Sequence, residues 1–219
     1  MILAGKCPPE KDEIEFIEEK TDFENIELYI ERKHLENYEK TVGNLKASGL
    51  NVVSVHTPHV PLSEEEYFHK ADELAQEFDA FLVFHTNKAM LSEIEDMEDL
   101  DLKSDLGYEN NPGDSYRFLK SMILDQDRDM VLDTAHIFMS DKNYLETIGE
   151  MLSEYSDQIP LIHICDSTLE EDGVGFGEGV MDMEKVSKTI SDSEFDGILV
   201  FEVMPEFQQD ALEKWREWS

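Results

Sequence analysis

Residues 159–166 read IPLIHICD, and this stretch decides the fold because an apolar run of strand length carries His163 inside it and Asp166 at its end. Five more short apolar runs have a histidine or an acidic residue at or near their C-terminal end: 52–59 (VVSVHTPH), 81–85 (FLVFH), 106–110 (LGYEN), 130–136 (MVLDTAH) and 197–202 (GILVFE). In a β/α barrel the C-terminal ends of the strands converge on one face, where catalytic groups lie. Six such strands in chain order therefore predict a metal site at the mouth of a β/α barrel.

The segments around these runs complete an alternation of strands and helices. Residues 2–7 and 25–30 predict two further strands, which makes eight. Helical spacing of apolar residues predicts helices near residues 12–20, 35–45, 63–78, 116–124, 144–155, 183–190 and 207–218. Ser63 and Glu66 are expected to form a capping box, and a weaker helix is expected to carry Met90, Ile94 and Met97. Alternating strands and helices imply a parallel sheet, so we expect one compact (β/α)8 TIM barrel domain over residues 1–219, in the α/β class.

Strand alternation orders the polar side chains of these runs. His163 and Cys165 point the same way, Val131 and Asp133 share a face, and His136 follows the strand. Polar groups inside a barrel are costly unless they are paired or bind a cation. Imidazoles and carboxylates together suit zinc, manganese, iron or cobalt. Outside these runs, His34 and His69 are expected to be surface residues.

The motifs together resemble one known family. YENNPG (108–113), LDTAH (132–136), HICDS (163–167), GEGVMD (177–182) and VFE (200–202) are similar, in this order, to the motifs of the xylose-isomerase-like barrels. That superfamily includes sugar isomerases and epimerases and endonuclease IV. The resemblance implies that Glu109, Asp133, His163 and Glu202 bind one divalent metal, with Mn, Zn, Co, Fe and Mg left open.

The endonuclease IV branch has three more ligand positions, which are filled here by His56, His85 and His136. The resemblance assigns these three to a second metal or to substrate, and a role as core or supporting histidines stays open for His56 and His85. That branch also has an Asp-x-His pair for a third metal ahead of GEG. The corresponding stretch here, EEDGVGFGEG, has no histidine, which puts a third metal in doubt.

Two functions follow as hypotheses. The first is a metal-dependent isomerase or epimerase of a small sugar or sugar phosphate, in which Glu109 and Glu202 exchange a proton through an enediolate. Substrate contacts are then expected from His59, Asn110, Glu178 and Lys6, and from backbone N–H groups of residues 175–179 if that loop is not simply flexible. The alternative is a metallo-phosphodiesterase like endonuclease IV.

Charge and composition bear on the partners. The net charge of −34 opposes binding to nucleic acid, which depends on clusters of Lys and Arg. The acidic residues are spread along the whole chain. They are either an ordinary solvated acidic surface or an adaptation to a saline cytoplasm, where salt screens their repulsion, and we favour the second interpretation. We expect neither a membrane span nor a signal peptide, and the two cysteines do not make a disulfide framework. A cytoplasmic enzyme is the expectation, with its oligomeric state open.

Overall fold

Eight parallel strands form a closed barrel in the order in which they occur along the chain. The structure is a computed structural model that describes residues 1–85 and 91–219, with the side chains of residues 91–93 left out. The strands are β1 Ile2–Cys7, β2 Asn25–Tyr29, β3 Asn51–His56, β4 Phe81–His85, β5 Leu106–Glu109, β6 Met130–Asp133, β7 Leu161–Ile164 and β8 Ile198–Phe201. Pairing of β1 with β8 closes the barrel, with Ala4 opposite Val200. The predicted (β/α)8 fold is confirmed.

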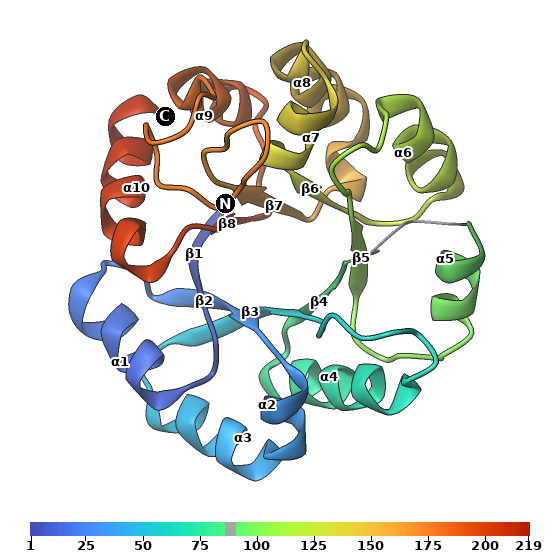
Figure 1. The fold of residues 1–219 in the computed structure, drawn as a ribbon, viewed down its shortest axis with the longest axis vertical. Coiled ribbons are helices and arrows are strands. Elements are labelled where there is room, and N and C mark those ends of the chain that lie inside the picture. Colours follow the sequence, from blue (N-terminus) through green and yellow to red (C-terminus); the bar gives the residue numbers. More distant parts are fainter. Residues whose placement is uncertain (86–90) are drawn as a thin grey trace.

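The helices form an outer ring around the strands, as Figure 1 shows. In the described residues they are α1 Lys11–Lys20, α2 Arg32–Glu36, α3 Tyr38–Ala47, α4 Glu65–Phe78, α5 Leu91–Glu98, α6 Tyr116–Met122, α7 Thr134–Ser140, α8 Tyr144–Tyr155, α9 Met183–Asp192 and α10 Pro205–Trp218. The apolar faces of these helices pack against the outward side chains of the strands, and a single large cluster of buried residues fills the space between them. The helix expected after β4 is present with Ile94 and Met97 buried, whereas Met90 lies outside the described residues.

Two local expectations were wrong. Ser63 does not cap a helix, because α4 begins at Glu65 with Glu64 at its N-cap and no side-chain cap bond. The helix expected over residues 35–45 is divided into α2 and α3, with Asn37 between them. A short helix for which no expectation was stated, α7, follows β6 directly, and Asp133 caps it by accepting a hydrogen bond from the His136 N–H.

The barrel interior is filled in layers, because alternate side chains of each strand point inward. An apolar layer consists of Ala4, Val83, Val131, Leu161 and Val200. The residue two positions later on each of these strands is polar: Lys6, His85, Asp133, His163 and Glu202. On β5 the apolar layer has Gly107, where a Cβ atom would lie 2.9 Å from the ring of Phe81. Two residues after Gly107 comes Glu109, so the polar layer lies nearer the C-terminal mouth.

Candidate metal centre

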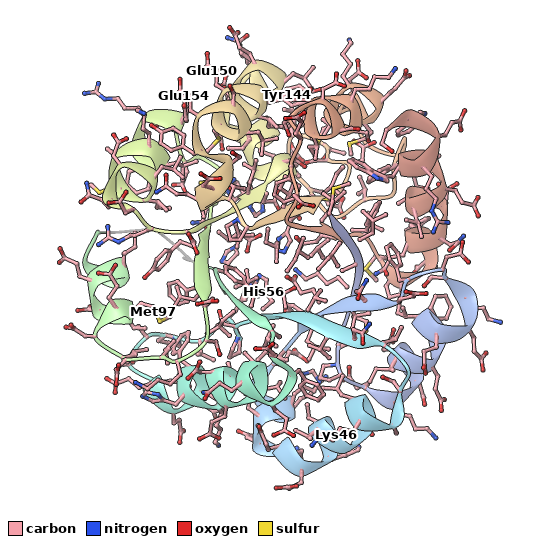
Figure 2. The ribbon with its side chains drawn as sticks, turned by 180° about the vertical axis from the view of Figure 1, so that it is seen from behind. Lys46, His56, Met97, Tyr144, Glu150 and Glu154 are labelled. Carbon is pink, nitrogen blue, oxygen red and sulfur yellow. The ribbon has the colours of Figure 1, made fainter. Side chains whose placement is uncertain are left out.

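Four side chains that were expected to bind a metal converge at the mouth of the barrel. The ligand atoms of Glu109, Asp133, His163 and Glu202 all lie within 4.8 Å of one another. They come from the ends of β5 and β6, from within β7 and from the residue after β8. The first three are buried, and the side chain of Glu202 is 27% exposed, so the cluster opens to solvent on the side of Glu202. Figure 2 shows the interior of the barrel, with His56 close to its axis and Lys46, Glu150 and Glu154 on the outer helices.

The nitrogen of His163 that faces the cluster is shared between two carboxylates. Its Nδ1 lies 2.8 Å from Oε1 of Glu109 and 2.8 Å from Oε2 of Glu202. One N–H can donate to one of these oxygens, and Oε2 of Glu202 is buried with no hydrogen-bond partner in the part of the chain that the structure describes. An oxygen and nitrogen donor set with a buried, unsatisfied carboxylate oxygen is suited to a divalent cation. The residues present therefore fit the metal that the motifs imply.

Asp133 has two tasks in this cluster. One oxygen accepts the N–H of His136 at 2.7 Å and so begins α7, which leaves the other for the centre. Burial, reinforced by the charges of Glu202 and Glu109 and opposed by His136, raises the pKa of Asp133 to about 6. The raised pKa therefore reflects mainly the burial of Asp133, with a further contribution from the two neighbouring carboxylates.

A buried carboxylate that the sequence analysis did not find lies beneath the cluster. Glu27 on β2 is fully buried, 3.0 Å from Nε2 of His163 and 3.0 Å from Nζ of Lys6. Lys6 also lies 2.5 Å from Glu202, so its ammonium group is already engaged by two carboxylates. Burial disfavours the charged form of Glu27, but the charges of His163 and Lys6 lower its pKa to about 2. Lys6 would have to leave these partners to meet an anionic group of a substrate.

His136 is held between two oxygen acceptors. Its Nδ1 lies 2.7 Å from the carbonyl oxygen of Asn110 and its Nε2 lies 2.9 Å from Asp172, a residue the sequence analysis did not single out. A carbonyl and a carboxylate both accept, so both ring nitrogens carry a proton. Although burial opposes this charge, Asp133 and Asp172 raise the pKa of His136 to about 10. The amide group of Asn110 is also engaged, by the backbone of Asp133.

Three further histidines at the barrel mouth, His56, His59 and His85, form a wall of imidazoles beside the cluster. His59 and His85 stack with their ring centroids 4.8 Å apart, and His56 lies 5.5 Å from His59 and 5.8 Å from His85. His56 contacts Glu109 through Nε2 at 3.0 Å, and Nδ1 of His85 is buried without a hydrogen-bond partner among the described residues. His59 lies exposed at the rim, where desolvation by the surrounding protein and the neighbouring His56 and His85 lower its pKa to about 4. Among the described residues, these rings belong to no group of three ligand atoms that lie within 4.8 Å of one another.

The glycine-rich loop after β7 is anchored by one carboxylate. Asp166 is buried and accepts hydrogen bonds from the backbone N–H groups of Ser167, Gly177, Gly179 and Met181. The expectation that the N–H groups of this loop face substrate was therefore wrong for Gly177 and Gly179. Glu178 is exposed on the same loop and forms no hydrogen bond or ion pair with the metal cluster in the described part of the chain.

His34 was expected at the surface but is buried, whereas His69 is exposed as expected. With Glu10 and Glu31 it forms a second group of candidate ligands. Its Nδ1 accepts the N–H of Glu31 at 2.9 Å, so the proton of the neutral ring is on Nε2, which lies 3.1 Å from Glu10. A metal at Nε2 would have to displace that proton while Nδ1 stays an acceptor, so this group is better suited to capping α2 than to metal binding.

Comparison with known proteins adds a family and several related folds. A sequence model described as xylose isomerase-like TIM barrel matches residues 14–218. No curated protein matches the sequence. Among solved structures, a D-tagatose 3-epimerase-like protein is 19% identical with a TM-score of 0.70, covering 99% of this chain and 97% of that one.

Two further solved structures are similar over nearly their whole length. A D-allulose 3-epimerase from Methylomonas sp. is 13% identical with a TM-score of 0.75, covering 100% of this chain and 98% of that one. A Thermus thermophilus protein soaked with ZnCl2 is 16% identical with a TM-score of 0.73, covering 100% and 98%. At these identities the likeness establishes the fold. No helix in the described residues is long and apolar enough to cross a membrane.

Proposed function

We propose that this chain, which belongs to the xylose isomerase-like TIM barrel family, is a divalent-metal-dependent isomerase or epimerase of a small sugar or sugar phosphate. The observation that carries the proposal is the convergence of Glu109, Asp133, His163 and Glu202 on one point at the barrel mouth. The solved relatives described as D-tagatose 3-epimerase-like and D-allulose 3-epimerase support a ketose as the class of substrate.

The four converging residues would hold the metal. A divalent ion bound there supplies a Lewis acid that polarises neighbouring hydroxyl and carbonyl oxygens of a sugar. His163 offers Nδ1, which faces Glu109 and Glu202, and Asp133 offers the oxygen that does not cap α7. The identity of the metal among Mn, Zn, Co, Fe and Mg is left to experiment.

Two of the four residues are also placed to move a proton. Glu109 and Glu202 approach Nδ1 of His163 from β5 and from the end of β8, so the two carboxylates flank the same space. Despite burial, Lys6 and His163 lower the pKa of Glu202, and His163 and His56 lower that of Glu109, so both begin as bases. One carboxylate removes the proton from the carbon next to the sugar carbonyl. The other takes a proton from a substrate hydroxyl and donates it to the resulting enediolate, and the first carboxylate then returns its proton to that oxygen.

Substrate contacts are proposed mainly for the open side of the mouth. His59 is exposed there and stacks on His85, so the two rings offer a flat apolar face beside the cluster. His136 keeps its charge next to Asp133 and is the second proposed contact, although both of its nitrogens are engaged, so a substrate would have to displace Asp172 from Nε2. Lys6 and Asn110 are proposed to act through their protein partners, because their polar atoms are engaged. Glu178 is retained as a contact only for a substrate that reaches the loop after β7.

The alternative function is phosphodiester cleavage with more than one metal. The observation that favours it is the pair of His56 Nε2 and Glu109 Oε2, 3.0 Å apart, with His85 nearby. Against it, both nitrogens of His136 are engaged, and the net charge of −34 repels DNA. Two tightly bound metals per chain and cleavage of an abasic oligonucleotide would establish this alternative.

The deciding experiment combines metal analysis with a substrate screen. Purified protein is stripped, reloaded with Mn²⁺, Co²⁺ or Zn²⁺, and assayed with ketopentoses, ketohexoses, their phosphates and an abasic oligonucleotide. We expect one metal per chain and interconversion of a sugar. Glu202→Gln should lower that turnover by about 10²–10⁴-fold and still bind metal, because an amide oxygen can coordinate but cannot accept the proton.

Glu206→Gln, an exposed change four residues later on α10, is the matched control. A wild-type protein that binds metal and turns over no sugar contradicts the proposal.

A further inference from the structure

Glu27 forms the floor of the metal centre, although no motif of the sequence points to it. Its carboxylate is fully buried, and both of its oxygens face His163: Oε1 lies 3.0 Å and Oε2 lies 3.1 Å from Nε2. The hydroxyl of Ser54 donates to Oε2 at 2.9 Å, and Nζ of Lys6 lies 3.0 Å from Oε1. Glu27 therefore reaches from β2 across the barrel to β7.

Pairing of three neighbouring strands holds this carboxylate in place. Lys6 on β1 is in register with Glu27 on β2, and Glu27 is in register with Ser54 on β3, just after a shift in the pairing of β2 with β3. Lys6 also contacts Glu202, so a single ammonium group joins Glu27 to a candidate metal ligand. The strand register therefore places Lys6 and Ser54 on either side of Glu27, and their contacts hold its carboxylate against His163.

The position of Glu27 determines which nitrogen of His163 faces the metal. A carboxylate only accepts, so Nε2 beside Glu27 carries a proton. The neutral ring then has its lone pair on Nδ1, which faces Glu109 and Glu202 at 2.8 Å. Nδ1 also faces acceptors, so a proton that it carries is the one a metal would displace. The proton on Nε2 is retained by Glu27.

We infer that Glu27, supported by Lys6 and Ser54, is a positioning residue that selects the Nε2–H form of His163 and so presents Nδ1 to a divalent metal. This inference rests on the proposed metal-dependent function. It assigns Glu27 a role in metal affinity, whereas a merely structural carboxylate would affect the stability of the fold. Partners of this kind orient ligating imidazoles, and their loss weakens metal binding by about 10–100-fold.

The first test measures Zn²⁺ affinity against a competing chelator, without any sugar. We expect Glu27→Gln to weaken Zn²⁺ binding by about 10–100-fold, because a Gln amide can turn its NH2 group toward Nε2 and stabilise the other form of the ring. Ser54→Ala should have a smaller effect in the same direction. Asp72→Asn is the matched control, since Asp72 is also buried but accepts hydrogen bonds from the backbone of Lys103 and Ser104, away from the centre. Equal Zn²⁺ affinity in the wild type and in Glu27→Gln overturns the inference.

The second test uses the wild-type protein and so does not depend on how well a variant folds. Imidazole ¹⁵N spectra of the Zn²⁺-loaded protein, assigned with His163→Gln, should show a protonated Nε2 and a metal-bound Nδ1 for His163. A ring that binds through Nε2 overturns the inference. Failure of the proposed function is a separate result: Zn²⁺ binding that depends on Glu27, together with no turnover of any sugar, supports the inference and contradicts the enzyme. A wild-type protein that binds no divalent metal contradicts both.

Discussion

The two halves of the barrel mouth use similar residues in different ways. On the half formed by β5–β8, three carboxylates and His163 direct their ligand atoms to one point. On the half formed by β2–β4, His56, His59 and His85 lie with ring centroids 4.8–5.8 Å apart. The resemblance assigned the first half to one metal. On the second half it left His56 and His85 open as ligands of a second metal, substrate contacts or supporting histidines, and His59 was expected to contact substrate. In the structure, the first half has the geometry of a metal centre and the second that of a wall beside it.

The physical difference lies in the charge of the groups and in their supports. Carboxylates that approach one another repel, so their convergence requires cations, which are supplied here by Lys6, His136 and His163. His59 and His85 have lowered pKa values, mainly because of desolvation, so they are neutral at pH 7 and can stack without repulsion. The repulsion among its carboxylates therefore distinguishes the half that is suited to a divalent cation from the half with neutral imidazoles.

The largest expected effect comes from removing a ligand on the carboxylate half. Asp133→Asn keeps a residue able to cap α7 but removes one charged ligand, so Zn²⁺ affinity should fall by more than about 100-fold, which exceeds the loss typical of an outer partner. His85→Gln on the imidazole half should leave the affinity and the stoichiometry of one metal unchanged. Competition titrations measure both. If the two variants lose affinity equally, the halves do not differ as described.

Asp166 is a carboxylate on the same half of the mouth, but it anchors a loop and is not one of the candidate metal ligands. Asp166→Ala removes the acceptor of four backbone N–H groups in the loop after β7. The free energy of unfolding should fall by about 3 kcal/mol, which is less than the sum of four separate hydrogen bonds because their contributions are not additive. Urea denaturation of the metal-free protein measures the loss, with the exposed Asp192→Ala as control. A loss equal to that of the control would show that the loop does not depend on this anchor.

The pH dependence of metal affinity separates the halves further. Burial disfavours a charged His163, but Glu27 and Glu202 raise its pKa, so the metal-free protein carries a proton that a metal must displace. Zn²⁺ affinity should therefore fall about tenfold for each pH unit below that raised pKa. Below about pH 6 the slope should steepen, because Asp133 then also takes up a proton.

His59 provides the control for this pH test. Its pKa of about 4 keeps it neutral between about pH 5.5 and 8, so His59→Gln should give the same slope as the wild type. Affinity that is independent of pH would contradict a protonated His163, and a slope altered by His59→Gln would contradict the neutral wall.

The smallest expected effect is that of salt, which should act on the stability of the acidic surface more than on metal binding at the barrel mouth. The net charge of −34 should make the fold more stable as salt screens repulsion, with a rise in Tm of about 2–4 °C for each kcal/mol relieved between about 0.1 and 2 M KCl. Buried pairs such as Glu27 with Lys6 are screened less, so metal affinity should change little over this range. A Tm that stays level or falls would contradict the interpretation of the acidic surface as an adaptation to salt.

Much of the fold was predictable because a barrel repeats one local pattern. Most strands carry apolar outward residues and end near His, Asp or Glu, so the eight strands follow from alternation. The four candidate ligands follow from the resemblance of the motifs to the xylose-isomerase-like barrels. Glu27 was missed for a physical reason. In NIELYI the apolar residues Ile26 and Leu28 face the helices, and a polar alternate face usually indicates solvent, whereas here it faces the barrel interior. The capping box at Ser63 and the single helix over residues 35–45 were wrong because the spacing of apolar residues locates a helix but does not fix its ends. In the structure α4 begins at Glu65, and Asn37 separates α2 from α3.

By itself the sequence determined the (β/α)8 architecture, because that depends on spacing along single strands, and the resemblance of its motifs to a known family supplied the four candidate ligands. The tertiary structure alone decided which groups each nitrogen faces. It brought Glu27 to Nε2 of His163, Asp172 to His136, Asp166 to its own loop and His34 into the interior. These partners lie on different strands and loops, and their distances depend on the closure and register of the barrel, which no local pattern records.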